Sequence, residues 1–271
     1  MNKKVLKNFK CDNMEMDYIS LSGAEPELFQ KHCHDWYELI FFIDADFEYT
    51  VEDKTYNVRS GDAVLIAPGK YHFLKIHGGK RYERAVFSFY PEFTGDALLT
   101  EELKSRGEFF SAADYPDFSK ELKELISGCV SLSERHTGLF IRASLIRAFL
   151  SVIRSPAAPH MPAREDGICS RAVRYISDNL SEISDTDDIA AALFVSKSSL
   201  QHAFRKNMDI PVMQYVRIKR LFAARQLISG GKSLRESAEQ VGYDEYTTFY
   251  RAFKAHFGYP PAIIKNSNTE K

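Results

Sequence analysis

The sequence predicts a two-domain protein: an all-β barrel with an appended helical hairpin, followed by an all-α domain. Three observations predict this arrangement. The chain has 271 residues, which is more than one small core needs. Its first part holds short segments rich in β-branched and aromatic residues, and its second part places apolar residues at helical spacing. A proline-rich stretch lies between them. We therefore expect a barrel over 1–117, a hairpin over 118–154, a linker over 155–166 and a helical domain over 167–271.

The composition is that of an ordinary globular protein, with 44% hydrophobic and 27% charged residues. The four cysteines are scattered and form no C-x-x-C pair, which favours reduced thiols in the cytoplasm. The densest apolar run, 39–43, is too short to span a bilayer, and the basic N-terminus has no apolar signal segment after it. The sequence predicts a cytoplasmic protein without a membrane partner.

The barrel is predicted from six short segments separated by turn residues such as Pro68-Gly69 and Ser60-Gly61-Asp62. Their regular spacing is typical of an antiparallel sandwich or barrel. The expected strands are 37–44, 47–51, 55–58, 62–67, 71–76 and 84–90.

Two segments after the barrel, 118–133 and 138–154, have helical periodicity. The apolar positions of the second segment cover more than one narrow stripe. One interpretation is that the helices pack on each other and on the barrel. The other is that the remaining apolar face forms the interface of a homodimer, because symmetric dimers are common.

The charge is distributed unevenly along the chain. The net charge is only −1, which by itself argues against a nucleic-acid partner. However, residues 167–271 hold 15 Lys and Arg against 11 Asp and Glu, a net of +4. Residues 1–166 hold 21 against 26, a net of −5. The positive charge is concentrated in the helical half.

The helical half holds two segments with the plan of a helix-turn-helix. In the first, the acidic run 185–188 starts a helix, the chain turns at Phe194-Val195, and Ser196 caps a second helix. Phe194 suits a turn poorly, because such a turn favours a residue that tolerates positive φ.

The second segment repeats this plan with better turn chemistry. Ser233 and Glu236 form an S-x-x-E capping box, and Gly242 occupies the turn. Asp244 is expected to cap the helix that follows.

A single helix is expected to join the two segments. Pro211 fits its first position and Gly230-Gly231 fits its end, which leaves about 18 residues, or roughly 27 Å. Successive major-groove faces on one side of B-DNA are about 34 Å apart. A rigid connector of this length places two recognition helices in adjacent grooves, with some bending of the DNA.

From about residue 170 to 264 the chain resembles the AraC/XylS family of bacterial transcription regulators. The second unit carries the signature, and residues of the connector also match: Tyr215, Arg217, Arg220, Ala223, Leu227, Ala238, Val241, Gly242, Tyr243, Phe249, Arg251, Phe253, Lys254, His256, Phe257, Gly258 and Pro261. Ser237 stands where the family usually has isoleucine, and the arginine usual after the last proline is missing. The resemblance implies binding to double-stranded DNA.

The outward residues of the two predicted recognition helices are the candidate DNA contacts. Gln suits adenine edges, whereas Lys and Arg suit phosphates or guanine. The first helix offers Lys197, Ser198, Gln201, His202 and Arg205; the second offers Tyr246, Thr247, Tyr250, Arg251 and Lys254. By resemblance, the base-facing positions are Ser198, Gln201, His202, Tyr246, Thr247, Tyr250 and Arg251. For each residue, the alternatives are a phosphate contact or a solvated helix face.

In the N-terminal half, His32, His34 and Glu38 have the same parity, so on one extended strand they would share a face. His72 follows Pro68-Gly69. The pattern resembles both cupin motifs over residues 15 to 95, and a cupin-like barrel ahead of the helix-turn-helix units is the usual layout of sugar-sensing members of the family. Three interpretations remain: contact with an effector by His32, His34, Trp36, Glu38 and His72; a divalent metal on His32, His34, Glu38 and His72; or buried structural imidazoles.

The sequence therefore predicts a homodimeric transcription activator controlled by a small molecule, with RNA polymerase as a further partner. A carbohydrate or related metabolite is the expected effector. We expect no catalytic activity and no cofactor, because no G-x-S-x-G, P-loop or G-x-G-x-x-G motif is present. The alternatives are a cupin metalloenzyme whose helical half is an interaction domain, and a regulator whose barrel binds no ligand.

Overall fold

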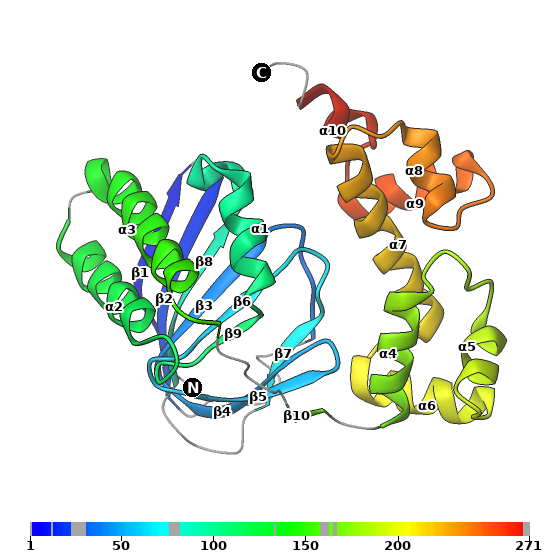
Figure 1. The fold of residues 1–271 in the computed structure, drawn as a ribbon, viewed down its shortest axis with the longest axis horizontal. Helices are drawn as coiled ribbons and strands as arrows, with labels where there is room; N and C mark the ends of the chain where they lie inside the picture. Colours follow the sequence, from blue (N-terminus) through cyan, green and yellow to red (C-terminus); the bar gives the residue numbers. More distant parts are fainter. Residues whose placement is uncertain are drawn as a thin grey trace. The chain divides into compact units, whose positions relative to one another are not determined.

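The computed structural model describes residues 2–11, 13–22, 31–75, 82–132, 134–157, 163–164 and 167–267. The chain divides into two compact units, Met1–Ala163 and Arg164–Lys271. The first is rich in strands and the second is helical (Figure 1). The predicted order of an all-β domain followed by an all-α domain is confirmed. Of the predicted linker 155–166, residues 158–162 and 165–166 lie outside the described residues.

The first unit is built on two antiparallel sheets, in the orders β1-β2-β8-β3-β6-β9 and β10-β5-β4-β7. Three helices follow in the chain, together with a short 3-10 turn at Pro91–Thr94. The strands are β1 (Asn2–Cys11), β2 (Met14–Ser22), β3 (Tyr37–Asp44), β4 (Asp46–Val51), β5 (Lys54–Arg59), β6 (Ala63–Ile66), β7 (His72–Lys75), β8 (Tyr82–Phe89), β9 (Phe109–Phe110) and β10 (Ala163–Arg164), and the helices are α1 (Ala97–Ser105), α2 (Pro116–Ser131) and α3 (Glu134–Arg154).

Alternation along β3 separates two cores. Leu39 and Phe41 belong to a cluster that also holds residues of α2 and α3, whereas Ile40 and Phe42 belong to a cluster formed with residues of the second sheet. The sheet is therefore buried on both faces. Because Glu38 has the parity of Ile40 and Phe42, it lies on the face away from the helices.

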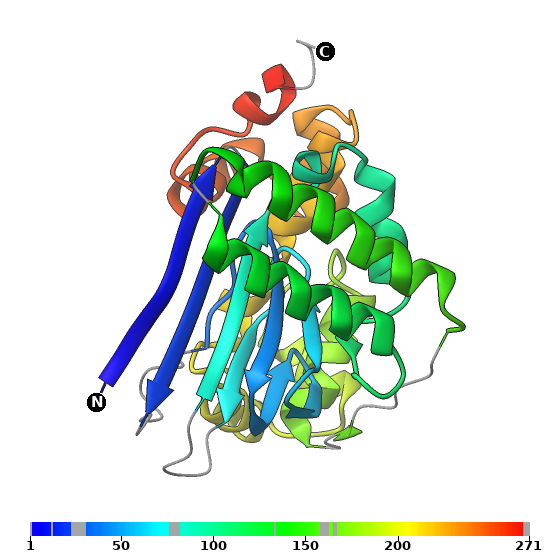
Figure 2. The same ribbon diagram turned by 90° about the vertical axis from the view of Figure 1, so that its left-hand side faces the viewer.

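The helices α2 and α3 lie side by side across one face of the six-stranded sheet (Figure 2). Gly128 permits their close approach, since a Cβ there would lie 2.3 Å from the Phe140 ring. The stretch His136–Arg154 of α3 is long and apolar enough to cross a membrane by length and composition alone. Its inner residues Leu145 and Phe149 are fully buried in the first core, so the described structure uses α3 as a core helix.

The six strands expected from the sequence all form, and their ends differ by one or two residues where they are described. The strands β1, β2 and β9 and the helix α1 were not expected, and neither was β10, which lies in the predicted linker. The two helices of the hairpin begin earlier than the periodicity indicated, at Pro116 and Glu134. Pro116 occupies the first turn of α2, where its missing N–H costs no hydrogen bond.

The second unit holds α4 (Ile168–Asp178), α5 (Thr186–Ala192), α6 (Lys197–Met208), α7 (Val212–Ser229), α8 (Leu234–Gln240), α9 (Tyr246–Phe257) and α10 (Ala262–Ser267). Capping boxes begin α5, at Asp185 and Asp188, and α8, at Ser233 and Glu236. The Ser196 hydroxyl accepts the amide of Ser199 at the start of α6. These caps were predicted, as was the 18-residue length of the connector α7.

Two predicted helix starts are wrong by one residue. The N-cap of α9 is Glu245 rather than Asp244, because the Glu245 carbonyl accepts the amides of Thr248 and Phe249. Pro211 is the N-cap of α7 rather than its first residue, because its carbonyl accepts the amides of Gln214 and Tyr215.

Candidate nucleic-acid interface and effector pocket

The helix α6 has one buried and one exposed face. Leu200, Phe204 and Met208 are buried at intervals of four residues and attach the helix to the unit. The opposite face carries the five candidate DNA contacts of the first helix-turn-helix. All five are exposed: Lys197, Ser198, Gln201, His202 and Arg205. Four of them, Lys197 excepted, line a cleft of about 460 Å³ that also includes the start of α7.

The helix α9 repeats this division. Phe249 and Phe253 are fully buried, and Thr247, Tyr250, Arg251 and Lys254 are exposed. Tyr246 is half-buried; its ring lies 5.9 Å from that of Phe249, and burial raises the pKa of its hydroxyl. Of the candidate contacts of the second unit, Tyr246 is the most enclosed by its own domain.

Two candidate contacts have partners within the chain. The Lys197 ammonium donates to Asp187 on α5 at 2.7 Å, and this bond raises the pKa of Lys197. The Arg251 Nε donates to the Thr247 carbonyl at 3.4 Å. A phosphate has to compete with Asp187 for Lys197.

Within the helical unit, Arg220 on α7 joins the two helix-turn-helix segments. Its Nη1 donates to the Gly242 carbonyl at 2.9 Å, in the turn of the second helix-turn-helix. Its Nε and Nη2 donate to the Leu180 carbonyl at 3.0 Å, and Nη2 also donates to the Ile183 carbonyl at 2.6 Å, in the loop that precedes α5. One guanidinium therefore fixes the turn of the second helix-turn-helix against the start of the first helix-turn-helix.

In the β-rich unit, a pocket of about 550 Å³ opens on the inner face of β2, β3 and β8. Its lining alternates along β8 as Arg84, Val86 and Ser88. Two polar atoms in it are buried and make no hydrogen bond to the described residues: the Arg84 Nε and the Trp36 Nε1. Buried donors without partners are costly, so the pocket favours a ligand that accepts hydrogen bonds.

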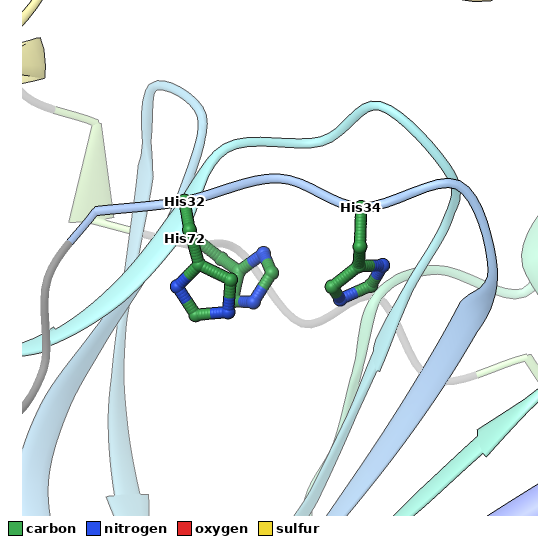
Figure 3. A group of neighbouring side chains, drawn as sticks. All are labelled: His32, His34 and His72. Atoms are coloured by element: carbon green, nitrogen blue, oxygen red, sulfur yellow. The ribbon is translucent and has the colours of Figure 1, made fainter. Parts of the chain in front are cut away.

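The histidines lie beside this pocket, but His32 and His34 do not share one strand with Glu38, which is what the parity argument had supposed. The strand β3 begins only at Tyr37, whereas His32 forms an isolated bridge with His72 and His34 lies in the segment between them and β3. The bridge places His72 directly beside His32. Figure 3 shows the three imidazoles directed into one space, and candidate ligand atoms of the three lie within 4.8 Å of one another.

Glu38, which also lines the pocket, faces two of these rings. Its Oε2 lies 3.5 Å from the His34 Nε2 and 3.3 Å from the His72 Nε2. Burial raises the pKa of the Glu38 carboxyl, but the two imidazoles outweigh it and hold the pKa well below its usual range. Trp36 stacks on the His34 ring with centroids 4.7 Å apart.

The predicted effector residues are thus brought together: His32, His34 and His72 in the cluster, Glu38 between cluster and pocket, and Trp36 against His34. The sequence analysis missed Arg84, Asp17 and Ser88, which line the pocket. The period-2 pattern of Tyr82, Arg84, Val86 and Ser88 was a usable signal, because it places the arginine on the face of two apolar residues.

The comparisons with known proteins match both halves. The family model of an AraC-like ligand binding domain matches residues 18–149, and that of a helix-turn-helix domain matches residues 189–266. The Msm operon regulatory protein of Streptococcus mutans is 32% identical over 241 residues, which cover 88% of this chain and 86% of that protein. The arabinose operon regulatory protein of Salmonella typhimurium is 27% identical over 216 residues, which cover 76% and 75%.

These matches define the class of the protein as a transcriptional regulator with a ligand-binding domain and a helix-turn-helix DNA-binding domain. The chain belongs to the AraC family. Its relatives are transcriptional regulators, which supports the expectation that it is not an enzyme and speaks against the metalloenzyme alternative. The structure of ToxT from Vibrio cholerae O395 aligns with 93% of this chain and 97% of its own at 12% identity and a TM-score of 0.37, a likeness that carries no argument.

Proposed function

We propose that this regulator is an activator that responds to a carbohydrate bound in the cupin-like pocket of its first domain. The observation that carries this proposal is the set of unpartnered buried donors beside a carboxylate: the Trp36 Nε1, the Arg84 Nε and Glu38. A polyhydroxylated ligand matches this set, because each hydroxyl both donates and accepts. The indole of Trp36 adds an apolar surface of the kind that sugar rings stack on.

The charges of the pocket support a neutral ligand. Glu38 lies close enough to Arg84 for their charges to interact, and Lys10 pairs with Glu15 at 3.2 Å on the pocket rim. Asp17 is a further acidic residue of the pocket lining, and it accepts a hydrogen bond from Asn8 at 2.7 Å. Among the described side chains that line the pocket, Lys10 and Arg84 are outnumbered by Glu15, Asp17 and Glu38, so these side chains leave no excess positive charge for a phosphate or a sugar acid. The names of two relatives, regulators of an arabinose and a raffinose operon, are in keeping with a sugar effector.

The outer face of α3 is the proposed interface of a homodimer. Leu139 is 69% exposed and Leu150 is 45% exposed, on a helix whose other face is core. Large apolar side chains exposed along one helix are typical of interfaces. Two copies joined there would present two DNA-binding domains to a promoter, where RNA polymerase is the further partner. The proposed location is the cytoplasm.

A ligand changes promoter occupancy only if it binds one arrangement of the protein more tightly than the other. A panel of neutral sugars, sugar acids and sugar phosphates is therefore screened by thermal shift with the full chain. We expect a neutral sugar to raise the melting temperature and to change operator affinity in a gel shift. The Arg84→Ala variant loses the shift, and the exposed Arg59→Ala control keeps it. A response to charged sugars alone contradicts the proposal, and no response to any sugar favours a barrel without a sugar ligand.

A further inference from the structure

Two rings of the histidine cluster, those of His34 and His72, direct hydrogen-bond acceptors toward Glu38. The His34 Nδ1 lies 2.9 Å from the Trp36 carbonyl oxygen, and the His72 Nδ1 lies 3.0 Å from the Lys70 carbonyl oxygen. A carbonyl oxygen only accepts, so each Nδ1 carries the proton. In the neutral rings both Nε2 atoms therefore present lone pairs, and these point toward the Glu38 carboxylate.

Both rings are buried. His34 is 8% exposed and His72 is 1% exposed. Among the described residues, neither Nε2 has a hydrogen-bond partner. Two lone pairs and a carboxylate that converge in a buried space repel one another unless a cation lies between them. Arg84 offsets part of the Glu38 charge, and the candidates for a cation between the carboxylate and the two rings are a metal ion and protons on the rings.

The distances favour a metal ion. A short hydrogen bond between an imidazolium and a carboxylate brings nitrogen and oxygen to about 2.7–2.9 Å. The Glu38 Oε2 is instead 3.5 Å from the His34 Nε2 and 3.3 Å from the His72 Nε2. Ligands about 2.0–2.1 Å from a tetrahedral metal ion lie about 3.4 Å from each other. The two Glu38 separations are those of two ligands on one ion, and the three imidazoles, whose candidate ligand atoms lie within 4.8 Å of one another, have to move closer together to share it.

We propose that His32, His34, His72 and Glu38 bind a divalent first-row transition metal ion such as zinc. Imidazole nitrogen and carboxylate oxygen are suitable ligands for such ions. The backbone carbonyls of Trp36 and Lys70 fix the ring orientations, as the outer partners of metal-bound histidines commonly do. The site connects the His32–His72 bridge to the start of β3, and Glu38 places it at the wall of the pocket.

The test is the metal content of full-length protein purified without a histidine tag. After stripping with a chelator and dialysis against Zn²⁺, Mn²⁺, Fe²⁺ or Ni²⁺, we expect about one equivalent of at least one metal by mass spectrometry. The metal should also raise the melting temperature of the stripped protein. Co²⁺ should give the visible absorption of a four-coordinate site, which loosely bound surface cobalt lacks.

Variants connect the metal to these residues. His34→Ala and His72→Ala should lose the metal, and the nearly isosteric Glu38→Gln should weaken binding at least tenfold. His202→Ala removes an exposed imidazole from the other domain and should keep the full equivalent. Circular dichroism of each variant establishes that it folds, and Glu38→Gln decides the matter if the alanine variants do not. Metal below a tenth of an equivalent in the wild type, or equal metal in Glu38→Gln and wild type, overturns the proposal.

Discussion

The two helix-turn-helix units satisfy the same backbone requirement with different residues. The turn between α5 and α6 has Phe194 at φ +56°, and the turn between α8 and α9 has Gly242 at φ +87°. Phe194 is 94% exposed, so its side chain meets no constraint. A Cβ on Gly242 would lie 2.6 Å from the Ser181 carbonyl oxygen and 2.7 Å from the Arg220 Nη2. We call Arg220 and the carbonyl groups that it bonds the Arg220 clamp. Packing against this clamp, and not the dihedral angle alone, makes glycine necessary in the second turn.

The comparison also separates the free energy of backbone strain from the free energy of the Arg220 contact. A residue with a Cβ in the left-handed region costs about 1–2 kcal/mol, which the first turn bears. The second turn avoids that strain and gains the Arg220 contact. The following predictions test whether this contrast is correct, from the largest expected effect to the smallest.

Replacing Gly242 with alanine should destabilise the protein by about 3 kcal/mol, because backbone strain and steric overlap add. Urea unfolding followed by circular dichroism measures it. The matched control is Phe194→Ala at the equivalent turn, where we expect a change within about 0.5 kcal/mol. Equal effects at the two turns would show that the packing argument is wrong.

Replacing Arg220 with alanine should cost about 2–3 kcal/mol, because it leaves carbonyls of both units without their donor. Arg217→Ala, one turn earlier on an exposed position of α7, is the control and should have little effect. The same urea titration serves for both variants. A small loss for Arg220→Ala would mean that water replaces the clamp.

Gln201→Ala and Arg251→Ala should each weaken operator binding by about 1–3 kcal/mol, or roughly 5–150-fold in Kd. Fluorescence anisotropy with a mapped operator and with unrelated DNA measures the loss and its sequence dependence. Asn207→Ala, at the far end of α6, is the control. Comparable losses in the two units support reading by both; an effect in one unit alone would limit base reading to that unit.

The capping boxes should contribute equally. Asp185→Ala at α5 and Ser233→Ala at α8 each remove a side chain that accepts the N3 amide, so each should destabilise by about 1 kcal/mol. Chemical unfolding of both variants at neutral pH makes the comparison. A much larger loss for one variant would reveal a further role of that cap.

The smallest effect should be a gain. Phe194→Gly relieves the left-handed strain in the first turn and removes only an exposed side chain, so we expect a stabilisation of about 0.5–1 kcal/mol. A higher urea midpoint with an unchanged slope checks it. A destabilised variant would mean that the phenylalanine ring contributes a contact in solution.

The sequence was most informative where local chemistry decides the structure. The capping boxes, the 18-residue connector and the expected strands follow from such local signals. The strand β1 was missed because its sequence, NKKVLKNFKC, has the lysines typical of a protected edge strand and too little alternation. Arg84 was missed because a charged residue on a strand is usually exposed, and its burial depends on a pocket formed by other strands.

The clamp at Arg220 also has a consequence for the operator. Since one guanidinium is bonded to both helix-turn-helix segments, we expect α6 and α9 to keep a constant separation and a constant relative rotation on the DNA. One added base pair between the two contacted segments turns the second by about 34–36°. The protein cannot follow that turn without breaking the clamp, so the spacing of the two segments should tolerate substitution of its bases but not a change in its length.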